Sequence, residues 1–190
     1  MRVLLLCLLA LLGSASFAAT EHAWPIDKVM GKPDAKITII EYSSLTCPHC
    51  AKFNEEALPR LKKDWIDSGK ARLVVRDFAR NTLDQAASMI AQCSGDRYFA
   101  FLDTYFHSQN NWMTAQQPIN AIRSIARLGG MGPDEVDACL RNQKLLSDIG
   151  QRQNEGQQLY DITGTPTFVV NGKVVEYDGD YARFVAQFPK

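Results

Sequence analysis

The chain has 190 residues, which is enough for one domain with a proper hydrophobic core or for one domain that carries an insertion. Hydrophobic residues make up 46% of it and charged residues 22%, a mixture typical of globular proteins. Lysine and arginine together number 21, as do aspartate and glutamate, so nothing in the charge balance indicates a nucleic-acid partner.

Residues 1–18 have the pattern of a secretory signal peptide. Arg2 supplies a short positive region, an apolar run follows it, and Ser16-Phe17-Ala18 has small residues at its first and third positions. The apolar run is about ten residues long, short of the roughly 20 that a membrane-spanning helix needs. We therefore expect cleavage after Ala18, with an uncleaved membrane tether as the alternative. Export would place the chain in an oxidising compartment, where disulfides form and persist.

The first predicted elements are a leader and a strand. Residues 20–36 are expected to cross the domain as a loop or a short edge strand. Residues 36–42 predict a strand, and the consecutive Ile39 and Ile40 make it nearly continuous in apolar side chains, as in a strand covered on both faces. Glu41, near the end of this strand, is therefore expected to be partly buried.

Two cysteines, Cys47 and Cys50, follow this strand, and a helical pattern begins directly after them. A helix N-terminus presents unpaired backbone N–H groups and roughly half a positive charge, which favour a thiolate. We therefore expect Cys47 to be an exposed nucleophile with a lowered pKa, and Cys50 to be the less accessible resolving thiol. Pro48 suits the first helical turn. His49 is expected to stabilise the reduced thiolate, the alternative being a solvent-exposed histidine without a role.

A C-x-x-C motif can also bind zinc or form an inert structural clip. Haem attachment is excluded, because Ala51 stands where that motif requires histidine. A zinc site with four cysteine ligands would want a second C-x-x-C motif, and the chain has none. The position between a strand and a helix favours redox chemistry, for which no metal and no organic cofactor is expected.

The remaining cysteines of the mature chain, Cys93 and Cys139, lie far apart in the sequence. In an exported protein two leftover cysteines most often pair. We therefore predict a structural disulfide between Cys93 and Cys139, with two free buried thiols as the alternative.

The helix after the cysteines is predicted over residues 48–67, with a kink at Pro59, because a proline removes a hydrogen bond and clashes with the preceding turn. Residues 71–78 predict a second strand. A strand–helix–strand sequence with a long crossover implies a parallel, right-handed pair of strands.

Residues 79–160 are predicted to be helical throughout, with helices at 83–93, 96–107, 118–128, 133–141 and 143–160. The period then changes, and two apolar runs joined by Asn171-Gly172 predict a β-hairpin. A terminal helix is predicted over residues 181–188.

Three stretches carry a family resemblance: Cys47-Pro48-His49-Cys50, Arg76-Asp77-Phe78 and Thr163-Gly164-Thr165-Pro166-Thr167-Phe168. They resemble the bacterial DsbA-like thiol:disulfide oxidoreductases, and the predicted elements match that class over residues 37–188. The resemblance implies an α/β thioredoxin fold, a central mixed β-sheet flanked by helices, with an inserted all-helical domain. Residues 19–78 and 161–190 would form the thioredoxin-like domain, and residues 79–160 the insert.

The resemblance also implies roles for individual residues. Pro166 would follow a cis peptide bond and face the redox pair, leaving the backbone of Thr165 free to pair with an extended substrate peptide. Glu41 would be a partly buried carboxylate with a raised pKa that accepts or relays the proton of Cys50, the alternative being a carboxylate that reaches solvent or pairs with a lysine.

The function implied is a monomeric periplasmic enzyme that introduces disulfides into unfolded or reduced exported proteins, and that a quinone-linked membrane partner reoxidises. A disulfide reductase or isomerase is the alternative enzyme. Isomerases of this kind usually carry an N-terminal dimerisation domain, for which residues 20–36 are too short. Outside enzymes, the alternatives are a non-catalytic secreted binding module or chaperone that kept the fold, and a zinc-binding chaperone.

Overall fold

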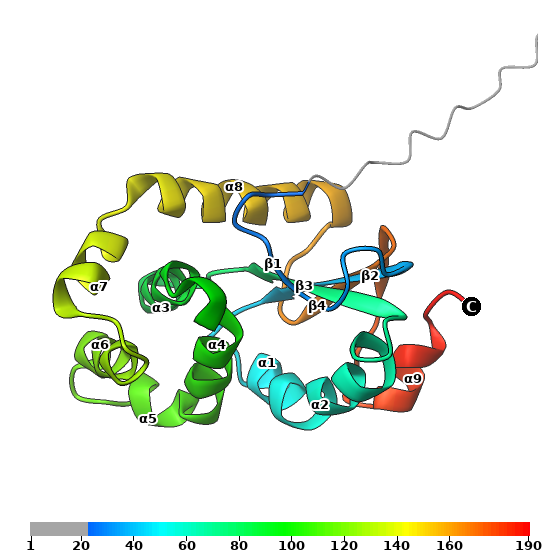
Figure 1. Ribbon diagram of the computed structural model, residues 1–190, viewed down its shortest axis with the longest axis horizontal. Coiled ribbons are helices and arrows are strands. Elements are labelled where there is room, and N and C mark those ends of the chain that lie inside the picture. The colour runs from blue at the N-terminus through cyan, green and yellow to red at the C-terminus, as the bar shows by residue number, and fades with distance from the viewer. Residues whose placement is uncertain (1–22) are drawn as a thin grey trace, which may run out of the picture.

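The computed structural model describes residues 23–190, so the predicted signal peptide at residues 1–18 lies outside the described residues (Figure 1). Within these residues the chain forms one five-stranded sheet in the order β1-β3-β2-β4-β5. The strands are β1 (Lys28–Met30), β2 (Ile37–Ser43), β3 (Ala71–Asp77), β4 (Thr167–Val170) and β5 (Lys173–Val175).

The strand pairing confirms the parallel pair of strands and the hairpin predicted from the sequence. β2 and β3 run parallel, with Ile39 opposite Leu73, as expected for two strands joined by a long crossover. The leader contributes the edge strand β1, which pairs antiparallel with β3. β4 and β5 form the predicted hairpin, and Asn171 and Gly172 at its turn have φ values of 46° and 79°. Both values are positive, as a two-residue type I′ turn demands.

The helix that follows the cysteines is less regular than predicted. It consists of α1 (Pro48–Lys52) and α2 (Leu58–Leu61), separated and followed by the π-helical turns Phe53–Ala57 and Lys62–Ile66. The first of these turns ends at Ala57, two residues before Pro59. A proline has no N–H to continue the α-helical ladder, and the wider π turn accommodates that gap in place of a simple kink.

The remaining helices largely follow the predicted positions, with two differences. The helix predicted from residue 96 starts only at Tyr98, because Gly95–Arg97 forms a 3₁₀ turn. A further short helix, Gln109–Met113, was not expected from the sequence. None of the helices in residues 23–190 is both long and apolar enough to cross a membrane. The set comprises α3 (Thr82–Cys93), α4 (Tyr98–His107), α5 (Gln109–Met113), α6 (Pro118–Leu128), α7 (Pro133–Leu140), α8 (Gln143–Tyr160) and α9 (Tyr181–Ala186).

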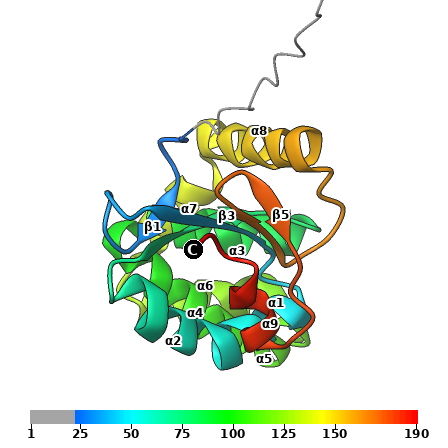
Figure 2. The same cartoon turned by 90° about the vertical axis from the view of Figure 1, so that its right-hand side faces the viewer.

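Helices cover both faces of the sheet. α8 lies across one face, whereas α1, α2 and α9 lie against the other, and α3 to α7 form a group beside the sheet (Figures 1 and 2). Gly156 on α8 packs directly on the ring of Tyr42, where a side chain would collide with the ring. This double cover explains the continuous apolar pattern of β2. The division into residues 19–78 with 161–190 and an insert at 79–160 stays a prediction.

Buried charges attach the leader and α8 to the sheet. Arg76 on β3 pairs with Asp27 of the leader at 3.0 Å, and Arg152 on α8 pairs with the same carboxylate at 3.1 Å. Arg152 also pairs with Asp77 at the end of β3. Because each of these charges is almost fully buried, each needs the others to offset its lost hydration.

Candidate active site

Cys47 stands where β2, the central strand of the sheet, gives way to α1. Its backbone is extended, with φ −95° and ψ 119°, so it is the residue that caps the helix. Its carbonyl oxygen accepts the N–H groups of Cys50 and Ala51, both at 3.1 Å. Pro48 occupies the first helical turn, where its missing N–H costs no hydrogen bond. The thiol of Cys47 therefore lies beside the first N–H groups of a helix, at its positive end.

The two cysteines are both free and both buried. Cys50 has no exposed surface, and Cys47 is only 2% exposed, so the expectation of an exposed Cys47 is wrong. The cause is the loop before β4, which lies at the same end of the sheet as Cys47 and covers the sulfur. Cys47 Sγ lies 3.2 Å from the carbonyl oxygen of Thr165.

The surroundings shift the pKa values of the two thiols in opposite directions. The pKa of Cys47 is lowered from 9.0 to about 4, chiefly by the hydrogen bond that the Cys50 thiol donates to it. Thr165 and the backbone N–H groups of Cys50 and His49 lower it as well, whereas burial opposes them. Burial raises the pKa of Cys50 well above its ordinary value. Near neutral pH the reduced pair therefore holds one thiolate, at Cys47, and one thiol, at Cys50.

The covering loop contains a cis peptide bond between Thr165 and Pro166. Its position follows from the sheet, because β4 pairs antiparallel with β2 and places Thr167 opposite Tyr42. The Thr165 hydroxyl is buried and has no other hydrogen-bond partner within residues 23–190, so it is free to donate to the Cys47 thiolate.

Glu41 lies on β2 and is 4% exposed. Burial raises its pKa from 4.5 to about 7, a hydrogen bond with Ser43 opposes this, and the charge of Cys47 adds to it. Glu41 lines a cavity of about 270 Å³ together with Asn54, whose buried Oδ1 has no hydrogen-bond partner among residues 23–190. Lys62, with a half-exposed side chain, lines the same cavity.

His49 is exposed beside the cysteines. Its backbone N–H is the part that lowers the pKa of Cys47. The side chain lines an open groove of about 390 Å³ with residues of α1, the cis-proline loop and the segment before α9. The other residues of this groove are Lys52, Thr165, Pro166, Tyr177, Asp178 and Gly179.

Two residues at the site were not found from the sequence. Asp84 on α3 and Gln109 on α5 both hydrogen-bond to the loop that leads into Cys47. Asp84 stands three residues after the capping residue Asn81, a place where an acidic residue is ordinary in any helix. Gln109 starts the helix that was not predicted. Neither position carries a sequence signal that would distinguish it.

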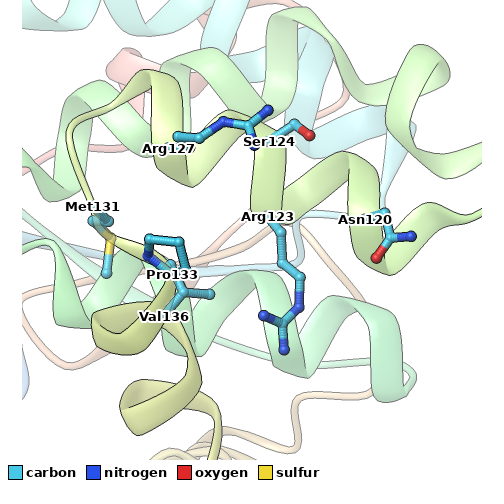
Figure 3. A pocket seen from close by; sticks show the side chains of 7 residues that line it. All are labelled: Asn120, Arg123, Ser124, Arg127, Met131, Pro133 and Val136. Atoms are coloured by element: carbon cyan, nitrogen blue, oxygen red, sulfur yellow. The ribbon is translucent and has the colours of Figure 1, made fainter.

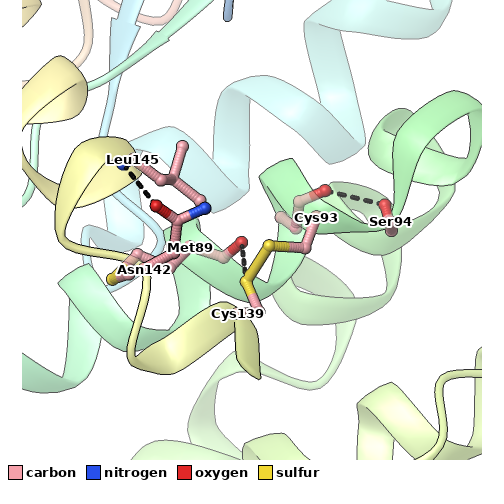
Figure 4. The surroundings of a disulfide bond; sticks show 7 residues. Met89, Cys93, Ser94, Cys139, Asn142 and Leu145 are labelled. Atoms are coloured by element: carbon pink, nitrogen blue, oxygen red, sulfur yellow. Dashed lines mark hydrogen bonds between the residues drawn. A yellow bond between two sulfur atoms is a disulfide. The ribbon is translucent and has the colours of Figure 1, made fainter. Parts of the chain in front are cut away.

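Cys93 and Cys139 are joined by a disulfide that links α3 to α7 (Figure 4). The sulfur of Cys139 lies 2.9 Å from the carbonyl oxygen of Met89, which stands one turn before Cys93 on α3. Asn142 caps the start of α8 nearby by accepting the N–H of Leu145. The disulfide therefore joins α3 to α7 near the place where α7 ends and α8 begins.

A third hollow, of about 260 Å³, lies between α6 and α7, and no cysteine lines it (Figure 3). Arg123, one of its lining residues, is engaged by Asp137 of α7. Within residues 23–190, no three histidine, cysteine, aspartate or glutamate side chains come together in a group that could hold a metal ion.

Residues 25–188 match the family model described as thioredoxin. A Rickettsia bellii protein named, by inference, a protein-disulfide oxidoreductase is 35% identical over 152 residues, covering 79% of this chain and 59% of its own length. The chain thus spans about three fifths of that relative. The disulfide bond formation protein D of Bacillus subtilis is 26% identical to this chain. The match covers 80% of this chain and 71% of the Bacillus protein. The structure of Wolbachia pipientis alpha-DsbA1 has a TM-score of 0.73 and 28% identity, covering 85% of this chain and 83% of its own.

Proposed function

Because this chain belongs to the thioredoxin family and is DsbA-like within it, we propose that it is an enzyme, a thiol:disulfide oxidoreductase that introduces disulfides into other proteins. The observation that carries this proposal is the unequal pair of thiols. A sulfur with a pKa of about 4 is a good leaving group, and its stable thiolate makes the reduced form favourable.

The proposed reaction has two exchange steps. A substrate thiolate attacks Cys47 of the Cys47–Cys50 disulfide, so that the S–S bond breaks and Cys50 leaves with the electron pair and takes up a proton. The second substrate thiolate attacks the substrate sulfur of the mixed disulfide, and Cys47 leaves as a thiolate. The substrate is oxidised by two electrons, and the cysteine pair is reduced by two.

Glu41 is the proposed proton partner of Cys50 in this cycle. Its pKa of about 7 lets it hold or release a proton near neutral pH. The cavity beside it has room for water and is lined by both Glu41 and Asn54, so it is the proposed path by which Glu41 exchanges its proton with solvent.

Substrates are proposed to bind as extended chains along the groove beside Pro166. The backbone of Thr165 lies next to the reacting sulfur, where a substrate strand can pair with it. Lys52 and Asp178 line the groove with opposite charges, and His49 adds a third polar group. Such a groove suits unfolded or reduced proteins of varied sequence.

We propose oxidation as the direction, with a reductase or isomerase as the second candidate. The low pKa of Cys47 favours oxidation, since a stabilised reduced form makes the disulfide a strong oxidant. The isomerase candidate has support of its own. The Novosphingobium aromaticivorans structure titled a protein-disulfide isomerase has a TM-score of 0.74 and 27% identity to this chain, covering 85% of it and 94% of its own chain.

The proposed location is the periplasm, reached through the signal peptide at residues 1–18. The Cys93–Cys139 disulfide supports export, because such bonds persist in oxidising compartments. The proposed partners are reduced exported proteins and a quinone-linked membrane protein that reoxidises the pair, and the proposed state is a monomer. No metal or organic cofactor is assigned.

The deciding experiment is the reduction potential of the Cys47–Cys50 pair. Residues 19–190 are equilibrated in glutathione buffers of known ratio, and the pair is followed by alkylation and mass. A potential of about −120 mV is expected for an oxidase, whereas about −270 mV would indicate a reductant and overturn the proposed direction. Oxidation of a reduced, unfolded substrate should be abolished in Cys47→Ser. A non-catalytic binding module would behave identically with and without this sulfur.

A further inference from the structure

The loop that carries the nucleophile is held by side chains from the helical group. This loop, residues 44–47, joins the end of β2 to the start of α1. Asp84 on α3 has no exposed surface, and Gln109 on α5 is 5% exposed. Both point at the loop rather than at their own helices, although they lie far from it in the sequence.

The carboxylate of Asp84 accepts hydrogen bonds from several donors of the loop. It accepts the hydroxyl of Ser44 at 2.6 Å and the N–H of Leu45 at 2.9 Å. It also accepts the hydroxyl of Thr46 at 3.2 Å and the N–H of Arg80 at 2.9 Å. Hydrogen bonds to a charged acceptor are stronger than neutral ones, and here they fix three consecutive residues before Cys47.

Gln109 fixes the loop from its carbonyl side. Its Nε2 donates to the carbonyl oxygens of Leu45, at 2.8 Å, and of Cys47, at 3.1 Å. The Cys47 carbonyl is also the first acceptor of α1, because it receives the N–H groups of Cys50 and Ala51. Gln109 therefore fixes the peptide unit from which the helix starts.

We propose that Asp84 and Gln109 are positioning residues that set the reactivity of Cys47. They hold its sulfur against the N–H groups at the start of α1 and against the Thr165 loop. If the loop moved by even a fraction of an ångström, the hydrogen bonds that stabilise the thiolate would lengthen. The helical group thus tunes the redox pair through the loop that carries Cys47. This inference deepens the proposed function, since exchange depends on that thiolate.

The alternative is that Asp84 and Gln109 are ordinary buried polar residues that contribute to stability alone. Burying a carboxylate is costly, and burial does raise the pKa of Asp84, while the bonds from Ser44, Arg80 and Leu45 act in the opposite direction. A pair that served stability alone would lower the unfolding temperature when removed and leave the ionisation of Cys47 unchanged. The two readings are therefore separated by the pKa of Cys47, measured in folded protein.

The test uses Asp84→Asn and Gln109→Leu in the full mature chain. Asp96→Asn and Asn110→Leu serve as controls, since both residues are exposed neighbours in the same helical group. The apparent pKa of Cys47 is measured in the reduced protein from thiolate absorbance and from alkylation rate against pH. We expect a rise of about one unit in each variant, a tenfold loss of thiolate preference, and no change in the controls.

Because both residues hold one loop, the double variant should shift the pKa by less than the sum of the single shifts. If either variant fails to fold, Ser44→Ala removes the shortest bond to Asp84 with a smaller change and should shift the pKa in the same direction. Folded variants with the wild-type pKa of Cys47 would overturn the inference. The measurement needs no substrate, so it stands apart from a failure of the proposed enzyme activity.

Discussion

The sulfur of Cys47 lies 3.2 Å from the carbonyl oxygen of Thr165, a residue 118 positions later in the chain. The order of the sheet brings them together. Cys47 follows the carboxyl end of β2, and Thr165 precedes β4, which pairs antiparallel with β2. The start of α1 then meets the cis-proline loop at one end of the sheet. The reacting sulfur is therefore placed by long-range pairing as much as by its own helix.

The first prediction concerns the donor that stabilises the Cys47 thiolate. The Cys50 thiol is the largest cause of the low pKa, so Cys50→Ala should raise the apparent pKa of Cys47 by about one unit or more. Cys50→Ser keeps a donor of similar size and should raise it less. Alkylation of Cys47 across a pH series, read by mass, checks both. An equal pKa in the serine and alanine variants would show that this hydrogen bond does not contribute.

The second prediction concerns protons taken up on reduction. With the pKa of Cys47 at about 4 and that of Cys50 far above neutral, only Cys50 binds a proton when the disulfide is reduced. One proton for two electrons makes the potential fall by about 30 mV per pH unit between about pH 5 and pH 8, half the slope for two protonated thiols.

The measurement is best made in Glu41→Gln, which removes a buried group beside the pair whose pKa also lies in this range. Glutathione equilibria at four pH values give the slope. A slope near 60 mV per unit would mean that Cys47 is a neutral thiol, and the account of its low pKa would then fail.

The sequence predicts the elements whose signals are local. Asn171-Gly172 predicts the hairpin of β4 and β5, and the proline at the start of α6 predicts the beginning of that helix. Both signals are local because backbone preferences act within a few residues. The order of the elements and the C-P-H-C position between a strand and a helix follow from such signals, whereas the thioredoxin fold is implied by the family resemblance. The cover over Cys47 does not, since Thr165 reaches it only through sheet pairing. The role of Asp84 likewise depends on its hydrogen bond with Ser44, 40 residues away in the sequence.

The third prediction is a pH dependence of stability caused by Glu41. Its pKa is about 7 in the folded protein against 4.5 ordinarily, so between these values the folded state keeps a proton that the unfolded state releases. The free energy of unfolding therefore falls as pH rises through this window, by up to about 3 kcal/mol, and Glu41→Gln should lack this loss.

Urea unfolding of the oxidised protein at pH 4 and pH 8 gives the comparison, because the Cys47–Cys50 disulfide then removes both thiols from the titration. The charge of Cys47, a smaller cause of the raised pKa than burial, is removed with them, so the loss in the oxidised protein is smaller than in the reduced one. Glu176→Gln, at an exposed glutamate, is the matched control and should follow the wild type. If Glu41→Gln gained no stability relative to the wild type between pH 4 and pH 8, the carboxyl group would be ionised at an ordinary pKa.

The fourth prediction separates the two cysteine pairs. Cys93 and Cys139 are 46 residues apart, and closing a loop of that length restricts the unfolded chain by about 4 kcal/mol in the chain-entropy model. Replacing both with alanine should therefore lower the free energy of unfolding by about 2–4 kcal/mol. The pKa of Cys47 should not change, because Asp84 holds the active-site loop from the other end of α3. Loss of the low pKa in this variant would show that the bridge, through α3, governs the redox pair.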